Sequence, residues 1–355
     1  MHKKLLIYFF FITLLPACNN VAPHITVVCE ENSIGNCVVK WETTPPIQGH
    51  VKVYASTNPN HISEHTPVAV ANITDQRVTV VTKNPSERYY YTLVFNDKYR
   101  VKTATRNINI AGIQNFRDLG GYPSYNTHKQ VRWGMIYRSA EINRLNDFSF
   151  RELKHLGIKT IVDLRGLDES ANKTPLQEGI HIIHIPVTVG SLSHILQGIE
   201  NHSIQTDTVY RIAEAGSRAL VREHIPVFRQ LFDVLLEKDN YPLIIHCSSG
   251  KGRTGIAAAL ILSALDVNSD IIMEDYLLSN KYFDIARFSK FAYHLPTHTQ
   301  EAITTLFSAK ESFLNAAKNE IEHMYGDVDT YLRKGIGLKK EEIKKLQKLL
   351  LEKNQ

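Results

Sequence analysis

One stretch restricts the fold of this chain more than any other: YPLIIHCSSGKGRTGIAAAL, residues 241–260. An apolar run typical of a strand leads into a polar turn rich in glycine, and a second apolar run typical of a buried helix follows it. We refer to residues 247–253, which begin with Cys247, as the cysteine loop. In α/β domains such a loop lies beyond the carboxyl end of a strand, where ligands bind.

The chain around the cysteine loop has the pattern of an α/β domain. GIKTIVDLRG, IHIIHIPV and YPLIIHC are typical of buried strands, and amphipathic segments such as FRELKHL and HIPVFRQLFDVLLEKD lie between them. Strands that alternate with helices predict a central, mostly parallel sheet flanked by helices over residues 105–355. Ser269 or Asp270 is expected to cap the helix that follows the buried one.

Residues 22–104 have a different pattern, with short runs rich in Val, Tyr and Thr between turn clusters such as NPN and KNPSE. This pattern predicts a small all-β sandwich, which resembles the fibronectin type III or immunoglobulin-like kind. No catalytic group of residues stands out there, so we expect a spacer or docking module.

Residues 1–18 are typical of an export signal, with a basic start, a short apolar run and Ala17 before Cys18. The apolar run is too short to span a bilayer. LPAC resembles a bacterial lipobox, which predicts an exported bacterial lipoprotein with its lipid on Cys18. The lipid would anchor the protein to a membrane of the cell envelope, in the periplasm or at the outer membrane. Cleavage and secretion without a lipid is the alternative.

The other cysteines fit an oxidising compartment. Cys29 and Cys37 flank a turn-rich segment between two strand-like runs, so they are candidates for a disulfide. If Cys18 carries the lipid, Cys247 is left as an unpaired thiol. An unpaired thiol in an exported protein indicates reactivity.

The net charge of +5 says little about partners. Many lysines lie in the tail LKKEEIKKLQKLLLEK, with glutamates between them. Interleaved charges are typical of a solvated helix face. We therefore expect no nucleic-acid partner.

The cysteine loop is suited to bind a phosphate. Its glycines allow the backbone to curl so that successive N–H groups point inward at the start of a helix, and such a nest binds anions. Arg253 adds a planar fork for two phosphate oxygens, and Lys251 adds a second cation. The predicted phosphate-binding residues are Ser248, Ser249, Gly250, Lys251, Gly252, Arg253 and Thr254.

The same positive field predicts a thiolate at Cys247 near neutral pH. In-line attack on phosphorus would give a phosphocysteine intermediate, with Arg253 stabilising the transition state. Thr254 would help the sulfur to leave during hydrolysis of the intermediate, and His246 would support the loop. The glycine spacing excludes a Walker A loop, and no partner cysteine for zinc lies nearby, so no metal or other cofactor is expected.

These residues carry a family resemblance. HCSSGKGRTG resembles the Cys-x5-Arg-Ser/Thr loop of protein tyrosine phosphatases. NFRDLGGY, GMIYRSAEINRL, IVDLRG and EDYLLSN resemble motifs of the bacterial tyrosine phosphatases that include secreted and envelope enzymes, over about residues 107–350. The resemblance implies the cysteine-phosphatase fold and metal-independent hydrolysis of phosphomonoesters by a protein tyrosine or dual-specificity phosphatase.

Gly252 departs from this family, which commonly has an acidic residue directly before the arginine. GKGR is similar to the loop of phosphoinositide 3-phosphatases, in which this glycine widens the pocket. The substrate is therefore a phosphorylated protein, lipid or small molecule, with a phosphoinositide or inositol-polyphosphate phosphatase as the alternative. A non-catalytic phosphate-binding lipoprotein, a rhodanese and an arsenate reductase are further alternatives.

A proton donor for the leaving group is the least defined part of the site. Asp163 ends a strand in VDLRG, and the resemblance points to the same residue. Its alternative role is an ion pair with Arg165 or Arg117. Arg117 and Asp118 are expected to organise the site from behind, and Arg138 to anchor a strand. Three further acids precede the cysteine loop, partly in a lid-like segment over residues 188–217: Asp168, Asp207 and Glu214.

Overall fold

The computed structural model describes residues 22–32, 34–84, 87–127, 129–142, 145–167, 169, 179–188, 190, 192–285 and 294–353. The expectations for Cys18 and Asp168 lie outside the described residues. None of the helices in these ranges is both long and apolar enough to cross a membrane.

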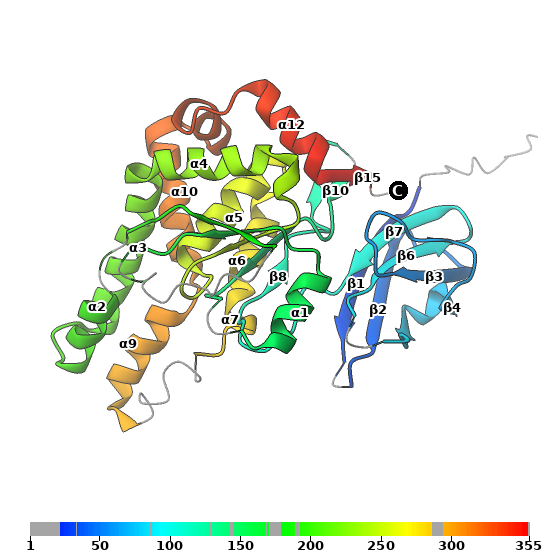
Figure 1. Ribbon diagram of the computed structural model, residues 1–355, viewed down its shortest axis with the longest axis horizontal. Helices are drawn as coiled ribbons and strands as arrows, with labels where there is room; N and C mark the ends of the chain where they lie inside the picture. The colour runs from blue at the N-terminus through cyan, green and yellow to red at the C-terminus, as the bar shows by residue number, and fades with distance from the viewer. Residues whose placement is uncertain are drawn as a thin grey trace, which may run out of the picture.

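Seven strands form the N-terminal β domain, at the right of Figure 1. One sheet has the order β1-β2-β5 and the other β4-β3-β6-β7, and all neighbouring strands are antiparallel. The strands are β1 (His24–Glu31), β2 (Cys37–Thr44), β3 (His50–Ser56), β4 (Ala69–Asn72), β5 (Arg77–Val80), β6 (Tyr90–Phe95) and β7 (Tyr99–Ala104).

The core of the β domain follows from the alternation of its strands. In β2, Cys37, Val39 and Trp41 are buried, whereas Lys40 and Glu42 between and after them are exposed. Trp41 donates its indole N–H to the carbonyl of Ile73 at 2.7 Å, which satisfies its buried polar atom. Cys29 and Cys37 form a disulfide between the neighbouring strands β1 and β2.

A five-stranded sheet with the order β13-β12-β14-β11-β8 lies at the centre of the catalytic domain. The pairs β13–β12, β12–β14 and β14–β11 are parallel, and β8 is antiparallel to β11. Its strands are β8 (Arg117–Asp118), β11 (Ile136–Ser139), β12 (Thr160–Asp163), β13 (His181–His184) and β14 (Leu243–His246); a second, three-stranded sheet contains β9 (Pro123–Ser124), β10 (Lys129–Val131) and β15 (Leu351–Lys353).

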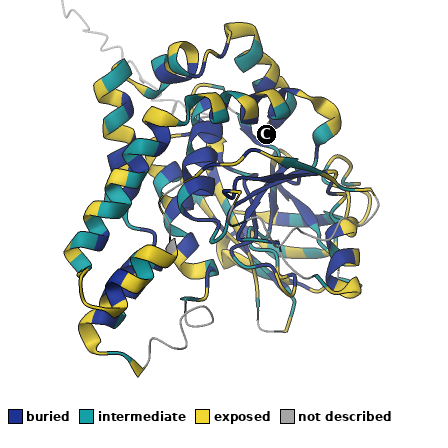
Figure 2. Ribbon diagram, turned by 60° about the vertical axis from the view of Figure 1, so that its left-hand side comes forward, coloured by how far each residue is buried: buried dark blue, intermediate teal, exposed yellow. Residues whose placement is uncertain are grey.

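Helices enclose the central sheet, and Figure 2 shows its strands buried among them. Ten of the thirteen residues of α5 are buried, because this helix is apolar on nearly every side. The helices are α1 (Asp147–His155), α2 (Leu192–Glu200), α3 (Thr206–Glu223), α4 (Ile225–Leu236), α5 (Gly252–Ala264), α6 (Ser269–Leu277), α7 (Ser279–Tyr282), α9 (Thr297–Phe307), α10 (Glu311–Tyr325), α11 (Val328–Thr330) and α12 (Lys340–Leu350).

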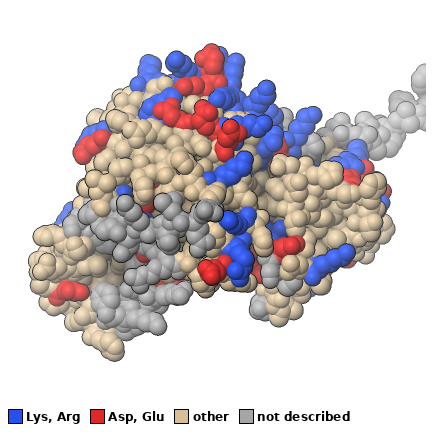
Figure 3. All heavy atoms as spheres, in the orientation of Figure 1, with Lys and Arg blue, Asp and Glu red and all other residues tan. Residues whose placement is uncertain are grey.

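The predicted fold class is confirmed: a mostly parallel sheet flanked by helices follows an early β-rich region. One local expectation is wrong. Asn268, rather than Ser269 or Asp270, caps α6, and its side chain accepts the N–H of Asp270. Figure 3 shows Lys and Arg interspersed with Asp and Glu over the end of the catalytic domain where α12 lies.

Candidate active site

The cysteine loop joins β14 to α5. The strand ends at His246 and the helix begins at Gly252, so Cys247 lies at the carboxyl end of a central strand and beside a helix N-terminus. Cys247 is 2% exposed. This is the position at which α/β sheets bind ligands, and the start of α5 adds partial positive charge.

The carbonyls of the cysteine loop are held from outside. Ser248 O accepts the N–H of Glu141 at 3.1 Å. Ser249 O accepts the side-chain amide of Asn115 at 3.0 Å. Because the C=O and N–H of a trans peptide point in opposite directions, the N–H groups of Ser249 and Gly250 point to the inner side of the loop.

Gly250 continues this arrangement. Its carbonyl accepts from Arg138 Nη2 at 2.8 Å and from the Asn115 amide at 3.1 Å, which turns the N–H of Lys251 inward. Gly250 has a φ of +65°, and a Cβ there would lie 2.3 Å from Ser139 O. Only glycine fits this position. The loop therefore turns three successive N–H groups to its inner side, as in an anion-binding nest.

Cys247 is held in the field of this nest. Burial alone raises the pKa of its thiol, but the charge of Arg253 and hydrogen bonds from Thr254 and from the backbone of Gly250 outweigh it. The pKa of Cys247 therefore lies below its ordinary value. A lowered pKa increases the fraction of thiolate, which is the nucleophilic form.

Arg253 forms a bidentate ion pair with Glu169. Its Nη2 donates to Oε1 of Glu169 at 2.8 Å, and its Nη1 contacts Oε2. Ser248 Oγ donates to the same Oε1 at 2.7 Å. Burial raises the pKa of Glu169, but the hydrogen bonds from Arg253 and Ser248 lower it to about 2. An ionised carboxylate thus bridges the two ends of the cysteine loop.

Asp163 is buried and pairs with Arg165. Its Oδ1 accepts the backbone N–H of Arg165 at 2.9 Å, and its Oδ2 accepts Nη2 at 2.7 Å. Burial raises the pKa of Asp163, but the hydrogen bonds and the charge of Arg165 bring it below its ordinary value. Of the two roles considered for Asp163, the structure shows the ion pair with Arg165.

His246 is fully buried beside this pair, on the neighbouring strand. Its Nδ1 lies 3.4 Å from the carbonyl of Cys247, and its Nε2 lies 3.7 Å from Asp163 Oδ1. Burial lowers the pKa of His246 to about 4. A neutral imidazole at neutral pH supports the loop without adding charge to it.

A buried cluster of charges supports the loop from the other side. Asp275, on α6, accepts from Arg117 Nε at 3.1 Å and from Arg138 Nη1 at 2.6 Å. Burial raises the pKa of Asp275, but the two arginines lower it far below its ordinary value. Through Arg138 this cluster holds the carbonyl of Gly250. The same arginine thus joins the buried acid to the nest.

The geometry agrees with the comparisons. The family model described as "Tyrosine phosphatase family" matches residues 108–352, which is more than half of the chain. The chain belongs to this tyrosine phosphatase family. It is a cysteine-dependent phosphatase of the protein tyrosine and dual-specificity type, which hydrolyses phosphomonoesters through a phosphocysteine intermediate.

Two relatives are similar over most of their length. The triple specificity protein phosphatase PtpB of Mycobacterium tuberculosis is 26% identical over 276 residues, which cover 68% of this chain and 98% of that protein. A protein of Cupriavidus necator assigned to the tyrosine-protein phosphatases is 31% identical over 228 residues, covering 62% of this chain and 81% of the relative.

Solved structures resemble part of the phosphatase only at low scores. The core catalytic domain of the PP-IP phosphatase Siw14 from S. cerevisiae has a TM-score of 0.28 and 18% identity, covering 59% of this chain and 96% of that one. P. aeruginosa TpbA has a TM-score of 0.25 and 16% identity, and the match covers 53% of this chain and 96% of the TpbA chain. Scores at this level do not bear on the chemistry.

Asp118 of this phosphatase does not face the cysteine loop. Neighbouring residues of a strand point to opposite faces, so Arg117 points to Asp275 and Asp118 points away. Asp118 accepts the N–H groups of Gly120 and Gly134, each at 2.7 Å. It also pairs with Arg88 of the β domain.

Lys251 is buried, and its ammonium donates to the carbonyl of Leu306 at the end of α9 at 2.6 Å. Burial lowers its pKa to about 7. Gly252 is next to it in the chain, and a Cβ built there meets no atom within 4 Å among the described residues outside its own helix turn. The position that departs from the family pattern therefore borders open space.

The other acids considered from the sequence lie on α3. Asp207 is exposed in its first turn, and Glu214 lies 4.0 Å from Arg218 on the same helix. Among the residues that contact the loop or its supports, Asn115, Glu169 and Asp275 were not singled out from the sequence. Each lies in or beside a quoted motif, and the motif was the only signal for it.

Proposed function

We propose that Cys247 is the nucleophile of this phosphatase and that Arg253 binds the phosphate. The observation that carries the proposal is the nest, in which the outward carbonyls of Ser248, Ser249 and Gly250 turn three N–H groups to the inner side of the loop that begins with Cys247. Arg253 contacts Glu169 through Nη1 and Nη2, and its Nε edge makes no hydrogen bond within the described residues. That edge is suited to a phosphate oxygen.

The reaction then has two steps. The Cys247 thiolate attacks phosphorus in line with the ester bond, a P–S bond forms, and the P–O bond to the leaving group breaks. The leaving oxygen takes up a proton from the solvent, and hydrolysis of the intermediate returns one. Water next attacks the phosphocysteine, the P–S bond breaks, inorganic phosphate leaves and the thiolate returns. Arg253 and the inward N–H groups bind the equatorial oxygens in both steps.

Asp163 is the candidate for the proton donor that the sequence favours, but its contacts support the second role considered for it. A general acid must be protonated before it donates, whereas the ion pair with Arg165 holds Asp163 ionised. We expect Asp163→Asn to lower kcat equally for aryl phosphates with good and poor leaving groups. A loss confined to poor leaving groups would restore the acid role.

We propose phosphorylated proteins as the main substrate class. A phosphoinositide or inositol polyphosphate is the second candidate, and the space beside Gly252 favours it, because this is the position at which the loop resembles that of phosphoinositide 3-phosphatases. A rate panel decides between them: a phosphotyrosine peptide, a phosphoserine peptide and phosphoinositides in mixed micelles. A kcat/KM at least tenfold higher for the lipid would replace the main proposal.

The basic test is turnover of p-nitrophenyl phosphate by the full chain. We expect hydrolysis that survives EDTA and is inhibited by vanadate, which mimics the five-coordinate phosphorus. Tight vanadate binding without turnover on any phosphate would favour a non-catalytic binding protein. Thiosulfate sulfurtransferase or arsenate reductase activity would favour the other two alternatives.

We propose that the phosphatase is an exported lipoprotein anchored to the cell envelope through Cys18. LPAC supports this, and the Cys29–Cys37 disulfide is typical of oxidising compartments. The test is labelling with radioactive palmitate in a bacterial host, followed by membrane fractionation. Label and membrane association should be lost in Cys18→Ser and kept in Cys37→Ser. Equal labelling of both variants would overturn the anchor.

A further inference from the structure

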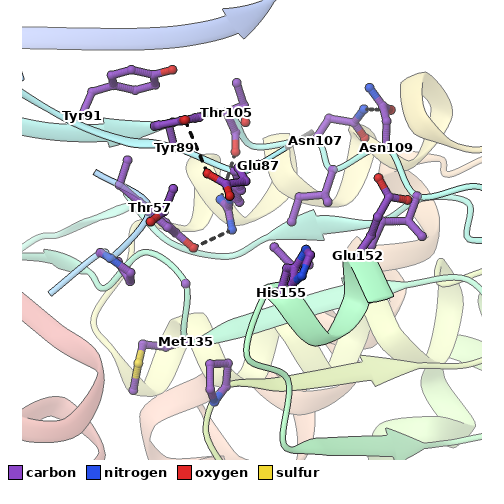
Figure 4. A pocket seen from close by; sticks show the side chains of 18 of the residues that line it. Thr57, Glu87, Tyr89, Tyr91, Thr105, Asn107, Asn109, Met135, Glu152 and His155 are labelled. Carbon is purple, nitrogen blue, oxygen red and sulfur yellow. Dashed lines mark hydrogen bonds between the residues drawn. The ribbon is translucent and has the colours of Figure 1, made fainter. Parts of the chain in front are cut away.

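The two domains of the phosphatase meet beside a cavity of about 620 Å³ (Figure 4). Thr57 and Tyr89 of the β domain line it, and Glu152 and His155 of α1 line it from the catalytic side. The cavity separates the domains over this part of the border. Arg88 and Tyr90, which also line it, contact the catalytic domain.

Arg88 of the β domain crosses this border. It precedes β6, and its side chain is 7% exposed. Its Nη2 lies 2.8 Å from Asp118 Oδ2, and its Nη1 donates to the hydroxyl of Tyr137 at 2.9 Å. The guanidinium of the β domain thus binds two strands of the catalytic sheet, β8 and β11.

The next residues of the same strands hold the cysteine loop. Tyr137 is paired with Asp118 in the register of β11 and β8, and Arg138 is paired with Arg117. The first pair faces Arg88, whereas the second pair faces Asp275. Arg138 also holds the carbonyl of Gly250 at 2.8 Å. Two adjacent cross-strand pairs therefore join the β domain to the nest.

We propose that Arg88 is a positioning residue for the phosphatase reaction. By fixing the Tyr137–Asp118 pair from the β domain, it fixes the adjacent Arg138–Arg117 pair and thereby the orientation of the Gly250 carbonyl. That carbonyl sets the direction in which the next N–H points at the anion. The β domain is then part of the active-site support and more than a spacer. The proposal rests on the proposed roles of Cys247 and the nest.

A second ion pair across the same border provides the control. Lys102 of β7 lies 2.7 Å from Glu352 of β15, with side chains 25% and 15% exposed. β15 belongs to the small sheet with β9 and β10, which does not contain the strand that leads to the cysteine loop. Loss of this pair removes a contact between the two domains that does not involve β8 or β11, the strands through which Arg88 is connected to the nest.

The test compares Arg88→Met with Lys102→Met in the full chain. One readout is kcat and KM with p-nitrophenyl phosphate. The other is the pH dependence of Cys247 alkylation by iodoacetamide, which reports the thiolate without turnover. For Arg88→Met we expect kcat to fall about tenfold and the alkylation midpoint to move to higher pH. For Lys102→Met both should stay within about twofold of the natural protein.

Unchanged kcat and alkylation in folded Arg88→Met would overturn the proposal, and so would equal changes in Lys102→Met. If Arg88→Met does not fold, Tyr137→Phe decides, because it removes only the hydroxyl that Arg88 binds. It should move alkylation in the same direction by a smaller amount, and an unchanged profile would overturn the proposal. A chain that turns over no phosphate would refute the proposed function, whereas the alkylation comparison would still test Arg88.

Discussion

The two domains bury different kinds of side chain. In the described part of the β domain the core is apolar, its buried polar residues are Thr92 and Thr103, and the charged side chain of Arg88 is enclosed only at the border with the catalytic domain. The catalytic domain instead buries charged residues close to the cysteine loop or its supports: Arg117, Asp118, Arg138, Asp163, Arg165, Lys251, Arg253 and Asp275.

This difference in buried side chains indicates that the two cores have different roles. Burying a charge costs much more free energy than burying a methyl group, unless a partner satisfies it. Apolar side chains of similar volume would stabilise the catalytic core at least as well. The clearest explanation is orientation: Arg117 and Asp275 hold Arg138, and Arg138 holds the carbonyl of Gly250 in the loop.

Of the substitutions that test the contrast between the two domains, Arg253→Met should have the largest effect on kcat. We expect kcat to fall about 10²–10³-fold, because the variant loses a preorganised donor to the transition state. Steady-state rates with p-nitrophenyl phosphate and inhibition by vanadate measure it. Arg229→Met is the matched control, since Arg229 pairs with Asp233 and Glu342 away from the loop. A loss below about tenfold in Arg253→Met would break the account of the loop.

A substitution in the apolar core of the β domain should instead lower stability and leave kcat unchanged. Leu93→Ala removes a fully buried side chain and should lower the free energy of unfolding by about 2–5 kcal/mol, while kcat per folded molecule stays unchanged. Urea unfolding and activity on the same samples measure both. Leu231→Ala, in the core of the catalytic domain, should cost a similar free energy. A loss of kcat in folded Leu93→Ala would contradict the claim that the core of the β domain affects stability alone.

Substitution of Glu169 should have the smallest effect, and its effect on the free energy of unfolding should depend on pH. Its pKa in the folded protein is about 2, below the ordinary 4.5, so its contribution to stability is present above pH 4.5 and is lost as the pH falls toward 2. Glu169→Gln should flatten this acid dependence in urea unfolding between pH 6 and pH 3. It should also lower kcat about tenfold, because Arg253 loses its fixed orientation. An acid dependence as steep as that of the natural protein would contradict the ion pair.

The fold and the loop could be predicted because their signals are local. Residues 241–260 alone predict a strand, a glycine-rich turn and a buried helix in this order. The alternation of strands and helices along the chain predicts the mostly parallel sheet. The requirement for glycine at 250 is only partly local: its positive φ belongs to the turn, whereas the Ser139 carbonyl that leaves no room for a Cβ is brought there by tertiary packing.

The supports of the loop could not be predicted in the same way. Asn115 lies 134 residues from Ser249 in the chain, and Arg117 lies 158 residues from Asp275, so only tertiary packing brings each pair together. Adjacent Arg117 and Asp118 were expected to act alike, but the strand turns them to opposite faces. Glu169 was missed because nothing near it in the chain indicates that it reaches Arg253.

The most direct test of the central claim is to trap the intermediate on Cys247. The full chain is mixed with p-nitrophenyl phosphate in EDTA, quenched in acid during turnover and digested, and the peptide with Cys247 is analysed by mass spectrometry. The account predicts the added mass of one phosphoryl group on Cys247, absent in Cys247→Ser. Steady turnover with no phosphoryl group on Cys247, or turnover by Cys247→Ser near the natural rate, would contradict it.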